Sequence, residues 1–297
     1  SEGVKEATAK FTNATLDLYH FVIEHLPATP AKFHYVFNLR DLSRVYEGCC
    51  LATIDSFDTG AKIARLWRNE CTRVFCDRTA TVEDFEIVNG KLSSIVQATW
   101  GGDSDTILSN PMIFGDYEQC VNRLTSEGED PRLYKDLGRF EQSRKIFTEV
   151  MDNYNLDRTP MTLVLFEYAL EHLIRVYRII RMSRGCGLLI GVGGSGKQSM
   201  TRLAAYCAGQ EIFGITLSRG YGEAQFKEDM KELYKSLASK DVVFLFTDAH
   251  VADEGFLESI NNMITTGMIP ALFEQDERDG IINAIRKDVK SAGIVDT

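Results

Sequence analysis

The segment Gly187-Leu-Leu-Ile-Gly-Val-Gly-Gly-Ser-Gly-Lys-Gln-Ser199 decides how the rest of the chain is interpreted. Three apolar residues, 188–190, predict a short buried strand, and a run of glycines follows them. The next residues, 199–206, have the spacing of a helix. A strand, a glycine-rich loop with the pattern G-x-x-x-x-G-K and a helix are together typical of a P-loop, which binds phosphate groups.

The chemistry of this loop suits a polyphosphate. Glycines adopt positive φ angles and bring backbone N–H groups close to phosphate oxygens. The start of the helix adds a partial positive charge, and the lysine side chain reaches the terminal phosphates. The alternative is a glycine-rich turn that binds nothing. The residues expected to bind the nucleotide are Gly191, Val192, Gly193, Gly194, Ser195, Gly196, Lys197, Gln198 and Ser199.

One position departs from the P-loop pattern. The residue after the lysine is normally Ser or Thr, whose hydroxyl binds Mg²⁺, but Gln198 stands there and Ser199 follows it. A glutamine amide oxygen is a less compact Mg²⁺ ligand than a hydroxyl oxygen. We therefore expect Gln198 or Ser199 to contact the metal, and the sequence leaves the geometry of that contact open.

A further metal-binding group is expected at the end of a later apolar run, 241–248. Such a run predicts a buried parallel strand. Asp248 at its end is expected to be the Walker B aspartate, which holds Mg²⁺ through its water shell. A hydrolytic site of this class usually has Glu next, but Ala249 follows, and Asp253 or Glu254 would need a particular fold-back to replace that Glu. We expect a site that binds nucleotide and hydrolyses it poorly, so no catalytic residue is assigned.

The elements after the P-loop alternate between strands and helices. A strand is predicted at 211–217 and an amphipathic helix at 226–237, ahead of the strand at 241–248. This βαβαβ order predicts an α/β fold with a doubly wound parallel sheet, which binds ligands at the carboxyl ends of its strands. Lys197 and Asp248 both fall at such ends.

The first third of the chain has helical spacing instead of alternation. A small helical bundle explains this pattern better than a partner-binding coiled coil, because the first helix stops at Pro27 and Pro30. The predicted helices are 4–26, 38–48, 58–75 and one that begins after Thr81. Thr81 and Asp84 are expected to form a capping box at the start of this fourth helix, although Asp fits its role in such a box less well than Glu.

The break Trp100-Gly-Gly-Asp-Ser-Asp105 is the best candidate for a domain boundary. It predicts an all-α domain over 1–104 and an α/β domain over 105–297. A long helix predicted at 161–181 carries arginines on one face. Such a stripe could bind polyanions, but we interpret it as a solvated helix face in an otherwise acidic chain.

Composition excludes several classes of protein. The chain has 297 residues and a net charge of −10, which argues against a nucleic-acid-binding surface. No apolar run approaches the ~20 residues needed to span a bilayer, and the polar start predicts no signal peptide. Seven cysteines without a C-x-x-C pair are expected to be free thiols in a reducing cytoplasm. The five histidines have no metal-ligand spacing.

Several stretches together resemble the motor region of a dynein heavy chain, whose ring has six AAA+ modules. The sequences of 37–41 and 191–199 are more similar to axonemal than to cytoplasmic heavy chains. The stretches similar to the small domain of the third module are Phe33–Val45 and Arg65–Phe75, and those similar to the large domain of the fourth are Leu163–Arg175, Gly191–Lys197, Gly220–Gly222 and Phe256–Asn262.

This resemblance implies a P-loop AAA+ fold that is incomplete and is preceded by the helical lid of another module. The sensor strand, the fourth module's own lid and the neighbour's arginine finger would follow Thr297. Arg40 falls where the lid arginine of the third module's nucleotide site is expected, and an ordinary surface arginine is the alternative.

The function implied is that of an ATP-driven, minus-end-directed microtubule motor in the cytoskeleton of the cytoplasm, in the axoneme of cilia or flagella. The first module would be the main hydrolytic engine, and the fourth a regulatory site for ATP or ADP with Mg²⁺. The implied partners are the neighbouring AAA+ modules and, through other parts of the parent protein, microtubules and the dynein intermediate and light chains. No nucleic acid and no membrane is expected as a partner.

Two other functions compete with this one, and whether the chain alone is an enzyme stays open. The first is a purely structural ring segment that binds no nucleotide. The second is a free-standing GTPase or small-molecule kinase, which is disfavoured because the chain has no Asn-Lys-x-Asp motif for guanine and no recognisable segment for an acceptor substrate.

Overall fold

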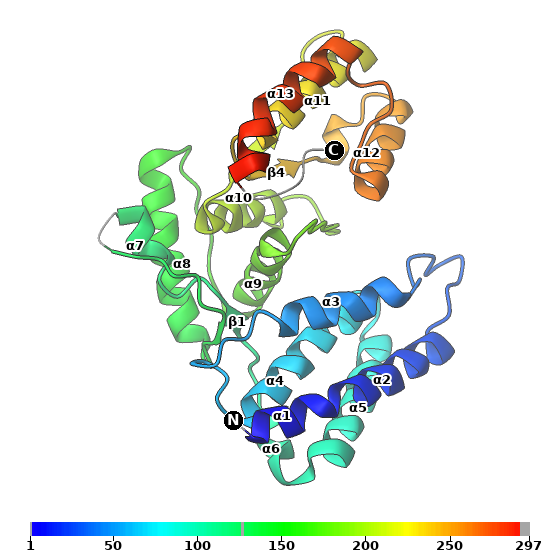
Figure 1. The fold of residues 1–297 in the computed structure, drawn as a ribbon, viewed down its shortest axis with the longest axis vertical. Coiled ribbons are helices and arrows are strands. Elements are labelled where there is room, and N and C mark those ends of the chain that lie inside the picture. Colours follow the sequence, from blue (N-terminus) through cyan, green and yellow to red (C-terminus); the bar gives the residue numbers. More distant parts are fainter. Residues whose placement is uncertain (1, 126–127, 292–297) are drawn as a thin grey trace. The chain divides into compact units, whose positions relative to one another are not determined.

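The structure, a computed structural model, describes residues 2–125 and 128–291. Two compact bodies divide the chain, residues 1–175 and 176–297 (Figure 1). The first is almost entirely helical, and the second combines helices with a small parallel sheet. The predicted fold class, a helical region followed by an incomplete α/β region, is therefore confirmed. In the part of the chain that is described, no helix is long and apolar enough to cross a membrane.

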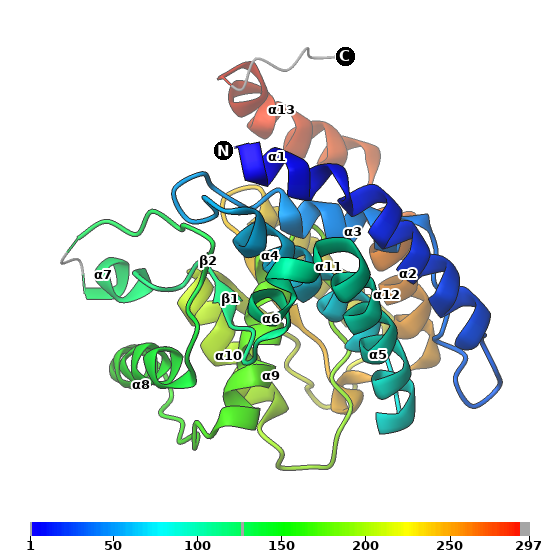
Figure 2. The same ribbon diagram turned by 90° about the horizontal axis from the view of Figure 1, so that it is seen from below.

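The helices predicted for the first hundred residues are all present, coloured blue to blue-green in Figure 1. The first predicted helix is interrupted at Lys10, whose backbone keeps right-handed helical angles. Helix α2 lies alongside α5 in both Figure 1 and Figure 2. The elements are α1 (Glu2–Ala9), α2 (Phe11–His25), α3 (Leu39–Cys49), α4 (Gly60–Cys71), the π-helical turn η1 (Thr72–Cys76), α5 (Val82–Trp100), η2 (Gly101–Asp103) and α6 (Ser104–Leu108).

The core of the helical body is centred on Trp67 of α4, which is fully buried. Its ring centroid lies 5.9 Å from that of Phe11 and 5.1 Å from that of Trp100, so rings from three helices meet there. The indole N–H donates to the Thr15 hydroxyl at 2.9 Å, which satisfies the only polar atom of that side chain. Residues far apart in sequence are thereby packed into one core.

Local capping fixes where two of these helices begin. The Asn38 side chain accepts from the backbone N–H of Arg40 at 2.8 Å, and Asp41 accepts from the N–H of Asn38 at 2.8 Å. At α5, Thr81 accepts from the N–H of Asp84 at 3.2 Å, which confirms the predicted cap.

Asp84 does not complete the capping box at α5 through its carboxylate. That carboxylate accepts instead from the Tyr35 hydroxyl at 2.7 Å and from the Lys32 ammonium. The side chain is therefore used to tie the loop before α3 to the start of α5.

The residues after the predicted boundary at 104/105 pack onto the helices that precede it. Ile107, Phe114 and Tyr134 belong to the same buried core as the helical bundle. The rings of Phe57, Phe114 and Tyr134 form a stack with centroids 6.4 and 6.2 Å apart. The domain boundary itself stays a prediction. The elements of this stretch are β1 (Phe114–Gly115), α7 (Cys120–Thr125), β2 (Lys135–Asp136), which pairs antiparallel with β1, and α8 (Phe140–Asp157).

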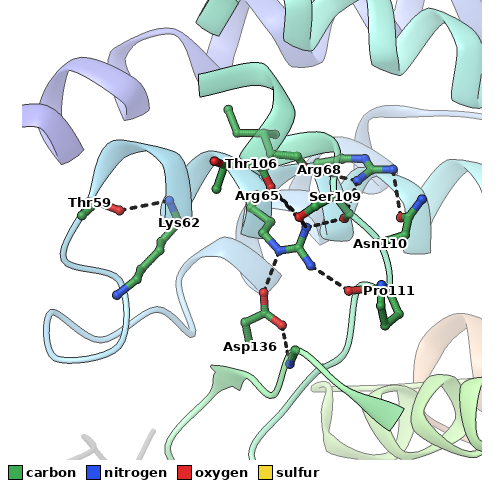
Figure 3. Close-up of polar contacts among 11 residues, drawn as sticks. Thr59, Lys62, Arg65, Arg68, Thr106, Ser109, Asn110, Pro111 and Asp136 are labelled. Atoms are coloured by element: carbon green, nitrogen blue, oxygen red, sulfur yellow. Dashed lines mark hydrogen bonds and ion pairs between the residues drawn. The ribbon is translucent and has the colours of Figure 1, made fainter. Parts of the chain in front are cut away.

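A polar joint between α4 and the stretch 106–136 accounts for this packing (Figure 3). The Arg65 guanidinium donates to Asp136 at 2.7 Å, to the Ser109 hydroxyl at 2.6 Å and to the Pro111 carbonyl at 2.7 Å. Arg68 donates to the Ile107 carbonyl at 3.0 Å. Helix α6 ends at this point, and two cations thus bind the carbonyls that its last turn leaves without partners.

Arg68 differs from Arg65 because no carboxylate among the described residues pairs with it. Burial, and secondarily the charge of Arg65, lowers the pKa of Arg68 to about 10. Its hydrogen-bond partners are neutral oxygens, including the Asn110 side chain at 3.3 Å. The helix end therefore compensates this buried charge through carbonyl dipoles.

The long helix predicted at 161–181 begins later than expected. Helix α9 spans Glu167–Arg181, and residues 161–166 have no regular secondary structure. The Asn155 side chain holds both backbone groups of Met161, and Arg144 donates to the Leu165 carbonyl at 2.8 Å. These contacts engage backbone groups that a helix would have used internally, which is why the prediction was wrong for this stretch.

The predicted arginine stripe on this helix is not simply a solvated face. Arg175 forms ion pairs with Glu171, one turn earlier, and with Asp77 of the turn after η1, whose oxygen lies 3.6 Å away. The Arg175 side chain is only 24% exposed. Its charge is therefore largely matched within the helical body.

The second body contains the predicted helix–strand–helix–strand order. Strands β3 and β4 are parallel, with Glu211 opposite Val242 and Gly214 opposite Leu245. Its elements are α10 (Lys197–Ala208), β3 (Glu211–Gly214), α11 (Glu223–Leu237), β4 (Val242–Leu245), the 3₁₀ turn η3 (Asp248–His250), α12 (Glu254–Thr266) and α13 (Gln275–Ser291).

The predicted buried strand before the P-loop is not formed. Leu188 and Ile190 are each 87% exposed, and neither β3 nor β4 pairs with this segment. A strand needs a neighbouring strand to satisfy its N–H and C=O groups. Residues 188–190 have no such neighbour among the described residues, so an apolar run by itself does not make a strand here.

A small aromatic core holds the second body together. The Phe226 ring of α11 stacks on the Phe256 ring of α12 with centroids 4.2 Å apart and planes 5° from parallel. Met230 and Leu233 extend this core along α11. Both strands remain partly exposed, so this body buries much less than the helical one.

The seven cysteines are free thiols, as the sequence predicts. Four of them, Cys71, Cys76, Cys120 and Cys207, are buried. Burial raises the pKa of Cys71 well above its ordinary value and raises that of Cys76 to about 12. Buried thiols of this kind stay protonated and unreactive near neutral pH.

Candidate nucleotide-binding site

The topology of the second body brings the P-loop and the predicted Walker B aspartate to one edge of the sheet. Helix α10 packs against β3 and β4, and Gly209, with φ +77°, reverses the chain between α10 and β3. The N-terminus of α10 therefore lies toward the carboxyl ends of the strands. Asp248 follows β4 directly, so both elements lie at the edge where α/β sheets bind ligands.

Two glycines give the loop its shape. Gly194 and Gly196 have φ angles of +75° and +81°, in the left-handed region that favours glycine. A Cβ at Gly194 would meet no atom within 4 Å, so the requirement at that position is conformational. Gly196 is the N-cap of α10, and its carbonyl accepts from the N–H of Met200 at 2.8 Å.

The Lys197 ammonium lies across the base of the loop. It donates to the carbonyls of Gly191 at 2.7 Å and Val192 at 2.8 Å, and to the Ser195 hydroxyl at 3.2 Å. The first two bonds hold the loop closed. The third is longer and goes to a neutral hydroxyl, whereas an anionic oxygen is a stronger acceptor. A phosphate oxygen could therefore replace Ser195 without opening the loop.

The backbone of the loop offers donors as well. The N–H groups of Gly193, Gly194 and Gly196 make no hydrogen bond within residues 2–125 and 128–291. The first N–H groups of α10 likewise have no partner inside the helix. Gly191, Val192, Gly193, Gly194 and Ser195 are exposed, so this row of donors and the ammonium beside it are accessible to an anion from solvent.

The two residues after the lysine differ in their surroundings. Gln198 is exposed and Ser199 is half-buried, and neither side chain makes a hydrogen bond in the described part of the chain. Thr201 is already engaged, because its hydroxyl donates to the Lys197 carbonyl at 2.9 Å. Gln198 and Ser199 are therefore the candidates in α10 for contact with a metal or phosphate.

The predicted Walker B region is a short turn that offers one carboxylate, that of Asp248. Asp248 is exposed at the start of η3, and Ala249 after it offers no polar side chain. Asp253 caps α12 by accepting from the N–H of Gly255 at 2.7 Å, and Glu254 lies in the first turn of that helix. Both carboxylates are therefore parts of the start of α12.

Arg40, expected to be the lid arginine of the third module's nucleotide site, belongs to the helical body. It is exposed in the first turn of α3, where its backbone N–H donates to Asn38.

A loop that the sequence did not single out as part of the site lies at the same edge. It follows β3 and contains Gly220, with φ +82°, and Tyr221. The Tyr221 hydroxyl donates to Asp229, its ring lies edge-on to Phe256, and burial raises its pKa. Glycines on both sides of a tyrosine are the signal that could have identified this anchored loop.

Comparison with known proteins identifies related chains for both bodies. The family model of the P-loop containing dynein motor region D4 matches residues 161–297, and that of an AAA+ lid domain matches residues 11–108. The chain is 51% identical over 292 residues to the Dynein-1-alpha heavy chain of the flagellar inner arm I1 complex of Chlamydomonas reinhardtii. It is 48% identical over 295 residues to human Dynein axonemal heavy chain 10.

These similarities cover nearly all of this chain and little of the relatives. The two alignments include 97% and 99% of the chain and 6% of each relative. A flagellar outer-arm dynein beta chain of Chlamydomonas reinhardtii is 37% identical over 298 residues, again 6% of its length. The relatives are therefore far longer proteins, of which this chain resembles one segment.

Proposed function

Because this chain belongs to the dynein heavy-chain family, we propose that it is a regulatory segment of a motor ring that binds ATP or ADP. Residues 1–104 would be the lid of the third module, with Arg40 directed to that module's nucleotide. Residues 105–297 would be part of the large domain of the fourth module. The matches to a lid domain and to motor region D4 support this assignment.

One observation carries the proposal of nucleotide binding. The Lys197 ammonium holds the loop closed through Gly191 and Val192, while free N–H groups line the same loop. This arrangement provides several donors for a diphosphate or triphosphate without a rearrangement of the backbone. Gln198 and Ser199 at the start of α10, and Asp248 through water, are the groups that would face a Mg²⁺ ion carried by the nucleotide.

Hydrolysis by this segment is proposed to be weak or absent. A water molecule attacking the γ-phosphate needs a group that orients it. Ala249 supplies none, and Asp253 is engaged as the cap of α12. Bound nucleotide would therefore act by favouring one conformation of the ring, through contacts between each lid and the next large domain.

The role of the parent protein is proposed from the names of its relatives, which are axonemal, flagellar and ciliary dyneins. It would be an ATP-driven, minus-end-directed microtubule motor in the axoneme of a cilium or flagellum. Neighbouring AAA+ modules would contact this segment directly. Microtubules and the dynein intermediate and light chains would bind elsewhere on the heavy chain.

Isothermal titration calorimetry with ADP and ATP tests the binding. The wild-type chain is expected to bind both nucleotides, and Lys197→Ala is expected to weaken binding at least about 100-fold, which corresponds to about 2.7 kcal/mol. Lys227→Ala is the matched control, because Lys227 is an exposed lysine of α11 whose one ion pair among the described residues is with Glu223. Equal binding by the Lys197 and Lys227 variants would contradict the proposed site.

The competing function is a ring segment that binds no nucleotide. It predicts no heat of binding with either nucleotide, at any concentration that the protein tolerates. Steady turnover of order 1 s⁻¹, as in efficient phosphoryl-transfer enzymes, would contradict the proposal in the opposite direction, because it would require a substitute for the missing Glu.

A further inference from the structure

Residue 198, the position of the P-loop that normally binds Mg²⁺, is poorly suited to that ion in this chain. In P-loops the hydroxyl of the residue after the lysine binds Mg²⁺ directly. Gln198 occupies this position, at the exposed start of α10. Its amide oxygen is two carbon atoms farther from the backbone than a serine or threonine hydroxyl. Within residues 2–125 and 128–291, the Gln198 side chain also makes no hydrogen bond that would fix its rotamer.

Mg²⁺ is demanding about the groups that replace its water. It requires near-octahedral geometry at about 2.0–2.1 Å and gives up its hydration shell reluctantly. A long exposed side chain must lose rotamer freedom to meet that geometry. A short hydroxyl on the first turn of a helix is already in place. Gln198 therefore contributes less to metal binding than Ser or Thr would at the same position.

The other oxygen ligands near the loop do not form a ready metal site. The Thr201 hydroxyl is held by the Lys197 carbonyl, and Asp248 is an exposed carboxylate. The Ser199 hydroxyl lies one residue beyond the position that binds Mg²⁺ in P-loops. In the described part of the chain, no three His, Cys, Asp or Glu side chains are grouped so that they could hold a metal ion. The donors for phosphate, by contrast, are Lys197 and free backbone N–H groups, which need no metal.

We infer that this site binds its nucleotide almost independently of Mg²⁺, with Gln198 as the residue that removes the metal dependence. The inference rests on the proposed function and specifies its ligand, since the phosphates would be recognised by protein donors alone. ADP suits such a site at least as well as Mg·ATP, because fewer negative charges then need neutralisation. The nucleotide state of the site would accordingly be insensitive to free Mg²⁺.

The test compares nucleotide affinity with and without the metal. Fluorescence anisotropy of a labelled ADP, with competition by unlabelled ADP and ATP, is measured on the full chain in excess Mg²⁺ and in EDTA. The wild-type dissociation constant is expected to change by less than about threefold. Gln198→Thr is expected to bind at least about tenfold more tightly in Mg²⁺ than in EDTA. Lys227→Ala, at an exposed lysine of α11, is the control and is expected to bind like the wild type in both buffers.

Each other result contradicts the inference in a recognisable way. A wild-type affinity that falls tenfold in EDTA overturns it, and Ser199→Ala then shows whether the Ser199 hydroxyl is the metal ligand. A Gln198→Thr variant that remains indifferent to Mg²⁺ also overturns it, because residue 198 would then not set the dependence. Absence of binding in both buffers would remove the proposed function together with this inference, whereas strong metal dependence removes the inference alone.

Discussion

Arg65 in the helical body and Lys197 in the second body differ in burial and in how fully their surroundings are hydrogen-bonded. In the helical body, Arg65 has a side chain only 10% exposed and is bonded to Asp136, Ser109 and Pro111. In the second body, Lys197 also bonds to backbone carbonyls, but the loop around it is exposed. The N–H groups of its three glycines 193, 194 and 196 make no hydrogen bond among the described residues. One cation is fully matched inside the protein, and the other retains capacity for an external anion.

This difference separates groups that stabilise the fold from groups that are available for binding. A buried polar group whose partners are all internal contributes to stability, and its removal leaves those partners unsatisfied. An exposed group with unused donors contributes little to stability and much to recognition. The comparison therefore predicts large stability effects in the helical body and small ones in the P-loop.

The largest effect is expected for Arg65→Ala. The change would leave Asp136 and the carbonyls at the end of α6 without their donor, at a cost of about 3 kcal/mol, the lower end of values for broken buried ion pairs because Asp136 is 27% exposed. Hydrogen exchange of peptides from α4 and α6, read by mass spectrometry, measures the loss of protection. Because a chain of two compact bodies need not unfold in one two-state transition, this local readout is preferable to a single melting curve.

The matched control lies on the same helix. Lys62→Ala removes a cation whose side chain is 53% exposed and, in the part of the chain that is described, forms an ion pair with Asp58 alone, so an effect below about 0.5 kcal/mol is expected. Equal loss of protection in the two variants would mean that the joint around Arg65 is not what holds α6 to α4.

A smaller effect is expected at the start of α5. Thr81→Ala removes the acceptor for the N–H of Asp84 and should destabilise the helical body by about 1 kcal/mol. The control is Ser94→Ala, an exposed serine within the same helix whose loss should change stability little. Urea unfolding followed by peptide-resolved hydrogen exchange distinguishes the two. A Thr81 variant as stable as the Ser94 variant would show that Tyr35 and Lys32, acting on Asp84, suffice to begin the helix.

The P-loop cation is expected to contribute little to folding. Lys197→Ala loses two bonds to exposed loop carbonyls, which water can replace, so the free energy of unfolding of the second body should fall by less than about 1 kcal/mol. The same variant is the one expected to lose nucleotide. A large loss of stability would instead assign Lys197 to the same structural class as Arg65 and weaken its role in binding.

The features that the sequence predicted are those encoded by neighbouring residues. Thr81 and Asp84 lie three positions apart, so a local rule identifies the cap. The strand predicted at 241–248 is present as β4, but it covers only Val242–Leu245 and is half-buried, paired in parallel with β3. The P-loop was recognisable for the same reason, since its shape depends on glycines within seven residues. Strand β3, by contrast, ends earlier than the predicted 211–217.

The errors concern partners that are distant in the sequence. An apolar pattern at 188–190 cannot report whether a neighbouring strand is available, and none is formed with β3 or β4. The start of α9 depends on Asn155 and Arg144, which hold the irregular segment before it. The joint at Arg65 connects residues 41 to 71 positions apart, and no spacing rule identifies such contacts.

The smallest predicted effect concerns the pH dependence of the helical body. The hydrogen bond from Lys32, with further bonds from Tyr35 and Thr81, holds the pKa of Asp84 below its ordinary value, and the same hydrogen bond raises the pKa of Lys32. Ionised Asp84 therefore contributes fully to the free energy of unfolding above its unfolded pKa of about 3.9, and this contribution is lost as the pH falls through the lower pKa of the folded state. Charged Lys32 contributes fully below its unfolded pKa of about 10.4, and this contribution is lost as the pH rises through the higher pKa of the folded state.

In the Asp84→Asn variant, the free energy of unfolding should consequently fall less than in the wild type as the pH is lowered. The variant would be less stable than the wild type near neutral pH, because Lys32 loses its charged partner, and the two should converge as the pH falls below about 4. Urea unfolding of both proteins at a series of pH values between about 2 and 7 measures this difference. Parallel curves over that range would mean that Asp84 is no better matched in the folded chain than in the unfolded one. The contrast between a matched helical body and an open P-loop would then not extend to this pair.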